Sequence, residues 1–575
     1  MNGRIASSLN VISWNVASWT TTAAHIARQH GSLGAWLDRH NIDILCLQEV
    51  KATRQKLLSV IDCALNPSQW DMFVAPCTAK PGLNGVATLV RKDRFHGSSF
   101  QGSLPTLGAD PAPFNVADLD SQGRCILTDH GAFTLINVYA PYDGERGVQV
   151  ALKLKFFSAL RDLVVKIQQT GRAVICVGDF NVASHIRDLF FEFRLVNVER
   201  ILSEWEKSLS MCETKIPFPL NNEVLKILLF LKSDWTSILE ILNARKIVEV
   251  PNGNKGTKFA VKIGPRNVQI GNRQISQGMC EVIANPHAVL TPEGCVYKPT
   301  SVLSIGDLFE VLLKVFHKEF SSKAKIAFSD LFGLPRSPPE VFESFNRIIS
   351  DGFLTDTYLH ANPAGRALNS ERFTCWDQYR NERYDNAGAR IDYIFVDKTI
   401  VPAVRLMETP DVFRSKGPTG AEVGERPLAF SSDRSKAFAS VTAQGQWKAV
   451  PFGGGGISNG DITQSAKNFE FSFTNPPQTG IVYTAPLFSD HVATSVVLDM
   501  ACLPVQGINE RIGDELGTRW KAAMAEATVF QAAVHLQPSK FHSLKDMFER
   551  TRKGIEDSPG STLEDSSAES KRRRF

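Results

Sequence analysis

Two periodic patterns of apolar and polar positions, one typical of strands and one of helices, alternate along the first part of the chain. Short β-branched runs that stop at turn or polar residues predict strands. These runs are LNVISW, DILCLQE, GVATLV, AFTLINVYAP and AVICVGDF. Between them, AHIARQHGSLGAWLDRH and ALKLKFFSALRDLVVKIQQ space their apolar residues three and four apart, which predicts an amphipathic helix in each. Strands alternating with helices indicate a layered α/β domain.

Two interruptions divide this pattern. From about Leu189 to Pro339, helix-like apolar runs flank a middle rich in Gly, Asn and Pro. We interpret this segment as an insertion: either an added subdomain or sequence that the mature protein does not carry. The pattern resumes with FNRIISDGFLTDTYL, RFTCWDQY and ARIDYIFVD, and ends with a turn and a strand in LFSDHVATSVVL. Between these parts, Pro410 to Pro486 is rich in Ser, Thr, Gly and Pro and predicts a long surface loop.

The pattern therefore predicts six segments in chain order. They are the first part of a domain, an insertion of unknown role, the continued domain, a flexible insertion, the final strand, and a mostly disordered tail: 1–188, 189–339, 340–409, 410–485, 486–503 and 504–575.

Composition narrows the class of protein. With 575 residues, 43% hydrophobic and 22% charged, the chain can build a large core and is ordinary for a soluble globular protein. The net charge of +4 is small, so binding of a polyanion requires a local basic surface. Ten cysteines without a C-x-x-C pair favour a reducing compartment over disulfides or structural zinc. The apolar run VLKILLFL is too short for a bilayer, so we expect a soluble intracellular protein with no membrane partner.

Polar side chains stand at six predicted strand ends. Any one of them could be a turn former or a cap, but six along one chain indicate a site on a rigid scaffold. They are Asn15 in SWN, Glu49 in LQE, Tyr139 in VYAP, Asp179 and Asn181 in GDFN, Asp392 in RID, and Asp490 and His491 in SDH. Two residues apart at a strand end, Asp179 and Asn181 point the same way and can address one metal-bound water or phosphate.

These residue types limit the chemistry. Carboxylate and amide oxygens with few imidazoles favour Mg²⁺ or Mn²⁺ over zinc. An ion held by one or two carboxylates typically acts on phosphate oxygens. His491, oriented by an aspartate from another strand, can act as a base or bind a phosphate oxygen. The set therefore predicts metal-assisted hydrolysis of a phosphoester.

The order of the motifs carries a family resemblance. SWNVASW, ILCLQEVK, LINVYAP, GDFNVA, ARIDYIF and FSDH resemble the endonuclease/exonuclease/phosphatase superfamily, and within it the exonuclease III type of apurinic/apyrimidinic (AP) endonucleases. LDSQGRCILTDH and RFTCW are similar to the class 2 AP endonucleases of eukaryotes. The resemblance covers about residues 9–188, 340–410 and 486–500. It implies a DNase I-like four-layered α/β sandwich, in which two packed mixed sheets are flanked by helices, with two large insertions.

The resemblance also implies a metal site. Mg²⁺ is the expected cofactor, with Mn²⁺ as an alternative. Glu49 would be the principal ligand, with Asn15 and Asp490 close by. The residues implied around the metal are Asn15, Glu49, Asp179, Asn181, Asp490 and His491.

Five residues receive catalytic roles from the resemblance. Asp179 would orient or deprotonate the attacking water, and Asn181 would help to hold it. His491, paired with Asp392, would contact the scissile phosphate. Tyr139 would donate to that phosphate or to the leaving oxygen. Such donors, aimed at the charge that develops on the phosphate, stabilise the transition state.

The sequence departs from the family pattern at a few positions. Ala17 stands where many relatives have Asp or Asn, which removes one outer contact to the metal. Cys375, Ala389 and Ile391 fall where other AP endonucleases place residues, some of them bulky, that enclose the flipped abasic sugar. The roomier pocket favours trimming of 3' ends over incision at abasic sites.

Two features of the tail have functional interpretations. FHSLKDMF resembles a sliding-clamp binding peptide, with Phe541, Leu544, Met547 and Phe548 as hydrophobic contacts; the alternative is an ordinary amphipathic helix. KRRR, Lys571 to Arg574, predicts a nuclear signal or a weak phosphate-binding patch; the alternative is a solvated charged end.

Together these observations predict a magnesium-dependent DNA repair nuclease of the nucleus. It would hydrolyse phosphodiester bonds at abasic sites and blocked 3' ends of double-stranded DNA, as AP endonuclease and 3' phosphodiesterase or 3'-5' exonuclease, in base excision repair. One alternative is another phosphohydrolase of the superfamily, acting on lipid or nucleotide phosphates. The alternative from a different class is an inactive clamp-binding scaffold.

Overall fold

The computed structural model describes most of the predicted α/β domain. The described residues are 8–53, 55–57, 65, 69–92, 108–143, 149–210, 222–243, 302–361, 373–376, 387–405, 479–482, 484 and 489–503, with short strand segments between 246 and 297 and between 438 and 450. The chain divides into two compact units. The first comprises Met1–Pro141, Leu154–Val182 and Glu343–Phe575, and the second comprises Tyr142–Lys153 and Ala183–Phe342.

The first unit contains two six-stranded mixed sheets. In the first sheet, β1 and β2 run parallel and all other neighbours run antiparallel. Its strands, in spatial order, are β23 (Gly480–Val482), β24 (Ala493–Asp499), β1 (Ser8–Asn15), β2 (Ile44–Gln48), β4 (Val86–Arg91) and β3 (Trp70–Ala75). The apolar run of β23 lies inside the segment expected as a surface loop, and its pairing with β24 corrects that expectation for these residues.

In the second sheet, β7 and β8 run parallel and the other neighbours antiparallel. Its strands, in spatial order, are β17 (Leu354–Asp356), β20 (Asp392–Asp397), β8 (Ala173–Asp179), β7 (Phe133–Tyr139), β6 (Cys125–Asp129) and β5 (Gly108–Asp110). Apart from the sheets, the unit contains a two-stranded pairing of β18 (Cys375–Trp376) with β19 (Gly388–Ala389).

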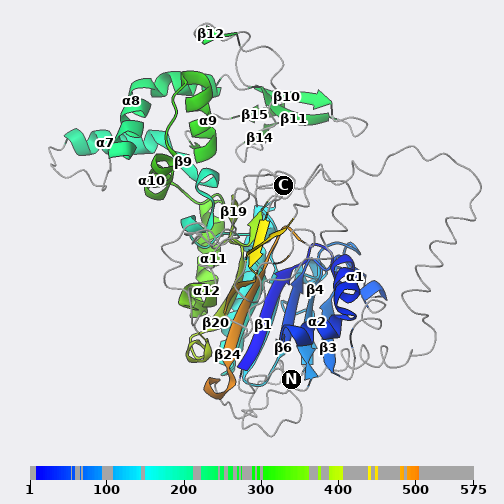
Figure 1. The fold of residues 1–575 in the computed structure, drawn as a ribbon. Coiled ribbons are helices and arrows are strands. Elements are labelled where there is room, and N and C mark those ends of the chain that lie inside the picture. Colours follow the sequence, from blue (N-terminus) through cyan, green and yellow to red (C-terminus); the bar gives the residue numbers. More distant parts are fainter. Residues whose placement is uncertain are drawn as a thin grey trace, which may run out of the picture. The chain divides into compact units, whose positions relative to one another are not determined.

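Helices cover the outer faces of both sheets, which confirms the predicted four-layered α/β sandwich. In Figure 1, α1 and α2 lie beside the first sheet, and α11 and α12 lie beside the second. The helix α6 packs against α11, and α5 is a short helix. The bounds of these helices are α1 (Trp19–His30), α2 (Leu33–Arg39), α5 (Ala117–Asp120), α6 (Val150–Gln169), α11 (Pro339–Asp351) and α12 (Thr357–Ala361). Short 3-10 turns occupy Val401–Ala403 and Met500–Cys502.

The expectation of one helix in AHIARQHGSLGAWLDRH is wrong. Gly31 has φ +83°, a left-handed conformation that ends α1. Ser32 then caps α2, since its side chain accepts a hydrogen bond from the Ala35 amide at 3.0 Å. The Gly-Ser pair therefore breaks the apolar periodicity into two helices.

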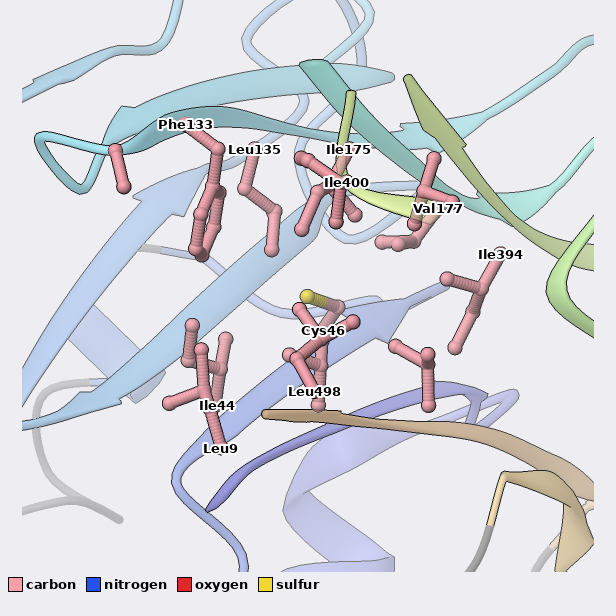
Figure 2. Close-up of a cluster of buried hydrophobic side chains, with 14 of the residues drawn as sticks. Leu9, Ile44, Cys46, Phe133, Leu135, Ile175, Val177, Ile394, Ile400 and Leu498 are labelled. Atoms are coloured by element: carbon pink, nitrogen blue, oxygen red, sulfur yellow. The ribbon is translucent and has the colours of Figure 1, made fainter. Parts of the chain in front are cut away.

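The inner faces of the two sheets form the core of this unit. Figure 2 shows side chains from one sheet facing those from the other. The first sheet contributes Leu9, Ile44, Cys46 and Leu498, and the second contributes Phe133, Leu135, Ile175, Val177 and Ile394. Each large apolar side chain buried in this way stabilises the fold by roughly 1.5–3 kcal/mol.

A buried polar bridge crosses this core just below the strand ends. Gln48, at the end of β2, donates to Asn137 of β7 at 2.7 Å and to Ser13 of β1 at 3.1 Å. Asn137 in turn donates to the Ala87 carbonyl at 2.9 Å. Hydrogen bonds between buried amides of the two sheets favour one register between them, so this bridge positions the strand ends that follow.

Gly178 determines how closely β7 and β8 approach before Asp179. Its φ is +138°, and an added Cβ would lie 1.9 Å from the Val138 carbonyl oxygen. We expect Gly178→Ala to lower the free energy of unfolding by about 3 kcal/mol or more, measured by urea denaturation, because the strands must separate. Gly171→Ala is the matched control: its φ is also positive, but nothing lies within 4 Å, so only the backbone cost of about 1–2 kcal/mol applies. Equal losses would contradict this account.

The second unit is built mainly of helices and has its own apolar core. The main helices are α7 (Val198–Ser210), α8 (Asn222–Asn243), α9 (Ile305–Phe316) and α10 (Ser322–Phe332). The strands β9 (Leu195–Asn197) and β16 (Val302–Ser304) pair antiparallel, and 3-10 turns occupy Ile186–Asp188 and Phe191–Phe193. Helices were predicted over NEVLKILLFLKSDWTSILEIL and DLFEVLLKVFHKEF, and α8 and α9 confirm them. The second ends early because His317 adopts φ +51°.

Further strands form separate antiparallel pairs. They are β10 (Lys246–Pro251) with β11 (Thr257–Lys262), β12 (Gln269–Ile270) with β13 (Arg273–Gln274), β14 (Ala288–Thr291) with β15 (Gly294–Tyr297), and β21 (Phe438–Val441) with β22 (Trp447–Val450). Within the described part of the chain, no helix is both long and apolar enough to traverse a bilayer. The expected clamp peptide, the basic end and most of the expected surface loop lie outside the described residues.

Candidate active site

The strand directions bring the predicted residues to one edge of the sandwich. Asn15 ends β1, and Tyr139 and Asp179 end the parallel strands β7 and β8, where they stand opposite each other. Asp392 begins β20, which runs antiparallel to β8, so it also pairs with Asp179. His491 precedes β24, which is antiparallel to β1. The fold thus brings residues that are far apart in the sequence into contact: the Trp14 side chain donates to the His491 carbonyl, 477 positions away.

Asn15 connects two of the carboxylates. Its fully buried side chain donates to Glu49 Oε1 at 3.2 Å and to Asp179 Oδ2 at 2.9 Å. Its amide oxygen accepts from the Ala17 amide at 3.0 Å. Because that oxygen already accepts a hydrogen bond, the contacts of Asn15 show it orienting the two carboxylates. Its role as a metal ligand stays a prediction.

Glu49 sits where the chain turns out of β2. Its φ of +51° is a left-handed conformation that costs roughly 1–2 kcal/mol for a residue other than glycine. Burial raises the pKa of the Glu49 carboxyl, but the Lys51 ammonium, which pairs with it, and the Tyr139 phenol, which hydrogen-bonds to it, outweigh burial and lower the pKa. Glu49 is therefore a carboxylate at neutral pH.

Tyr139 is held as a neutral phenol. Burial and the negative charges of Glu49 and Asp179 raise its pKa well above the usual range. The Arg124 guanidinium lies 5.0 Å from the centre of the Tyr139 ring and fixes the ring plane. Tyr139 can therefore donate a proton or a hydrogen bond at any physiological pH.

Asp392 and His491 form a tight buried pair. His491 Nδ1 lies 2.9 Å from Asp392 Oδ2, and Nε2 lies 3.9 Å from Asp179 Oδ2. Burial lowers the pKa of His491, but Asp392, then Cys375 and Asp179, outweigh burial and raise the pKa well above its usual value. The ring is therefore an imidazolium at neutral pH. The Ser489 hydroxyl fixes the backbone, accepting from the His491 amide at 3.0 Å and donating to the Asn15 carbonyl at 2.7 Å.

Asp179 is a carboxyl whose pKa lies near neutral pH. Burial and the neighbouring Asp392 raise its pKa to about 7, against the opposing effects of His491, the Asn181 amide and Asn15. The Asn181 amide donates to Asp179 Oδ1 at 2.8 Å, and the Asn181 side chain donates to the Ala140 carbonyl at 3.0 Å. A carboxyl that titrates near neutrality suits proton transfer.

The donor set fits a hard divalent cation. Burial raises the pKa of Asp490, and the nearby Glu49 carboxylate raises it further against the opposing charge of His491. A bound cation would relieve this repulsion between two carboxylates. An imidazolium offers no lone pair, so with His491 charged the ligands available are carboxylate oxygens, which suit Mg²⁺. Glu49 and Asp490 could form such a pair, and Asp179, Asp392 and His491 form another group, whose ligand atoms lie within 4.8 Å of one another.

Some residues of the site were not foreseen from the sequence. Lys51, Arg124 and Ser489 contact site residues directly. Lys51 and Arg124 lie inside quoted motifs, LQEVK and LDSQGR. For Lys51, the signal that could have found it is its charge, since it lies two residues after the strand-end carboxylate of Glu49 and pairs with it.

Comparison with known proteins agrees with this geometry. Residues 12–193 match the Endonuclease/Exonuclease/phosphatase family. The match covers less than half of the chain, and it confirms the resemblance of this part to the family that the motifs indicated. A more particular similarity is to DNA-(apurinic or apyrimidinic site) endonuclease 2 of Homo sapiens, with 29% identity over 203 residues, 30% of this chain. The DNA-(apurinic or apyrimidinic site) endonuclease of Dictyostelium discoideum is 25% identical over 182 residues, 32% of this chain and 44% of that protein.

The matched region spans 39% of the length of the human relative. Among solved structures, the catalytic domain of APE2 from Xenopus laevis aligns with a TM-score of 0.35 and 17% identity. That alignment covers 69% of this chain and 85% of that one.

Proposed function

We propose that this protein is a magnesium-dependent DNA repair nuclease, hydrolysing phosphodiester bonds at abasic sites and blocked 3' ends. The observation that carries the proposal is the convergence of Glu49, Asp490 and Asp179 with an imidazolium and a neutral phenol at one edge of the sandwich. The names of the similar proteins support DNA with abasic sites as the substrate class. Action in the nucleus, in base excision repair, belongs to the same proposal.

Glu49 and Asp490 would hold the metal ion. When bound there, Mg²⁺ would supply positive charge beside the phosphate oxygens. Lys51, paired with Glu49, adds a second cation close to the phosphate. Asn15, bonded to both Glu49 and Asp179, sets the separation between the metal-holding carboxylate and the base.

Asp179 would take the proton of the attacking water. The Asn181 amide and Asn15 each donate to a different oxygen of this carboxylate, so its orientation is fixed while lone pairs remain for the water. Its pKa of about 7 lets it accept a proton without being too weak a base.

His491 and Tyr139 would donate to the phosphate. Asp392 holds Nδ1 of the imidazolium at 2.9 Å and directs Nε2 toward Asp179. Tyr139 bonds to Glu49, so its phenol lies beside the metal-holding carboxylate. Donors fixed in advance in a buried site stabilise developing negative charge more strongly than water does.

A preference for DNA 3' ends and a protein partner belong to the same proposed function. Cys375 and Ala389 are small and face each other in the β18–β19 pair, which supports a pocket that favours trimming of 3' ends. The sliding clamp is the proposed partner, through Phe541 to Phe548.

A substrate panel tests this function. With Mg²⁺, we expect the purified protein to cut an abasic duplex and to trim a blocked 3' end, with little activity on an inositol phosphate. Chelation of the metal is expected to lower the rate by about a hundredfold or more, and added Mg²⁺ to restore it. Turnover of the inositol phosphate alone would point to another phosphohydrolase. No turnover of any substrate would favour a scaffold.

A further inference from the structure

A second group of metal-binding side chains shares part of this site. Cys375, Asp490 and His491 each offer one ligand atom, and these atoms all lie within 4.8 Å of one another. Cys375 takes no part in the chemical step of the proposed hydrolysis, although it belongs to the proposed substrate pocket. Backbone pairing holds the three residues together. Cys375 and His491 form an isolated antiparallel β-bridge, and the Trp376 amide donates to the Asp490 carbonyl at 3.1 Å.

The ligand types differ from those that suit magnesium. A thiolate, an imidazole and a carboxylate together select Zn²⁺, whereas Mg²⁺ prefers oxygen ligands alone. Zinc bonds of about 2.0–2.3 Å place tetrahedral ligands roughly 3.5 Å apart, so small side-chain rotations bring Cys375, Asp490 and His491 into range.

The contact between Asp392 and His491 supports a metal at Nε2 of His491. Asp392 holds Nδ1 at 2.9 Å, which leaves Nε2 for a ligand. Metal-binding histidines usually donate their second ring nitrogen to a carboxylate in this way, which raises the basicity of the ligating nitrogen. Asp392 lies outside the group of three, so it is an independent feature of the site.

The group reaches solvent through Asp490. Asp490 is partly exposed, whereas Cys375 is buried and 9% exposed. Cys46, Cys125 and Cys176 are buried more deeply than Cys375, at 0%, 3% and 0% exposed. Among the described residues, Cys375 is the cysteine that belongs to a possible metal-binding group.

We infer that Cys375, Asp490 and His491 form an inhibitory binding site for Zn²⁺. Binding releases two protons to solvent, one from the Cys375 thiol and one from Nε2 of the imidazolium, and no electron is transferred. Three protein ligands leave a fourth position for water. The bound ion removes His491 from the phosphate and Asp490 from the magnesium site. The inhibition rests on the proposed function, whereas the binding does not.

Direct metal binding is the first test, with Co²⁺ as the spectroscopic probe in the full-length protein. We expect wild type to bind one Co²⁺ with thiolate-to-metal absorption and tetrahedral visible bands, which added Zn²⁺ removes. Cys375→Ser and Cys375→Ala are expected to lack the thiolate absorption and to bind Zn²⁺ at least about tenfold more weakly. Cys502→Ser is the matched control, because Cys502 is exposed and lies outside both metal-binding groups. Circular dichroism checks that the variants fold.

The second test is inhibition of the nuclease in excess Mg²⁺. Each protein is compared with its own rate without zinc, and Cys375→Ser is expected to need about tenfold more Zn²⁺ for half inhibition than wild type. The inference is overturned if wild type shows no thiolate absorption, if Cys502→Ser abolishes that absorption, or if Cys375→Ser stays as sensitive to Zn²⁺ as wild type. An inactive wild type that still binds Co²⁺ through Cys375 would refute the proposed function and leave the binding site standing.

Discussion

Replacing Asp179 with asparagine is expected to lower kcat on an abasic duplex by about a thousandfold or more, with the fold intact. An amide cannot accept the proton of the attacking water, and general-base catalysis contributes roughly a hundred- to ten-thousandfold. The asparagine oxygen can still accept from the Asn181 amide, which now donates at 2.8 Å. Asp179 is buried and its pKa is raised to about 7, so losing its charge removes a cost of burial, which offsets part of the lost hydrogen bond from the Asn15 side chain.

A matched control separates this effect from the loss of any buried carboxyl. Asp43 is also buried, and its side chain accepts from the Asn10 amide at 2.9 Å. It precedes β2, at the end of the strand opposite Glu49. Asp43→Asn should leave kcat within about twofold of wild type, since it lies outside the site, and change only stability. If Asp179→Asn cleaves as fast as Asp43→Asn, Asp179 is not the base.

Strand direction explains why the site could be predicted from the sequence. A polar residue directly after an apolar run marks a strand end, and parallel neighbours end at the same edge. This places Tyr139 and Asp179 together without any structure. Asp392 joins them because its strand runs the other way and begins at that edge.

The network around these residues could not be predicted in the same way. The bridge from Gln48 to Asn137 joins two sheets, and no local pattern states which inward-facing amides meet across a core. The left-handed conformation of Glu49 is also invisible to periodicity. Tertiary contacts impose it against the local preference of a glutamate.

Secondary structure was missed where local signals are short. The strand β23 has three residues and gains its stability from pairing with β24 rather than from its own propensity. Conversely, the helix predicted through Gly31 has a continuous apolar stripe, and one left-handed residue overrides it. In both cases the backbone partner or conformation, not the hydrophobic pattern, decides the outcome.

The second large effect concerns His491. We expect His491→Gln to lower kcat by about a hundredfold or more, because it removes the imidazolium that would face the developing charge on the phosphate. KM should change less, since the interaction is made chiefly in the transition state. Single-turnover cleavage of an abasic duplex measures the chemical step directly.

Asp392 distinguishes a charged histidine from a merely structural one. Asp392 is the strongest of the neighbours that raise the pKa of His491, whose ring it contacts at 2.9 Å, and it also raises the pKa of Asp179. Asp392→Asn should therefore lower kcat by about tenfold or more, while Asp392→Asn combined with His491→Gln should be no slower than His491→Gln alone. Residues that act as a unit show such non-additive losses. Losses that multiply in the double variant would mean that Asp392 acts through Asp179, whose pKa it also raises, and not through His491.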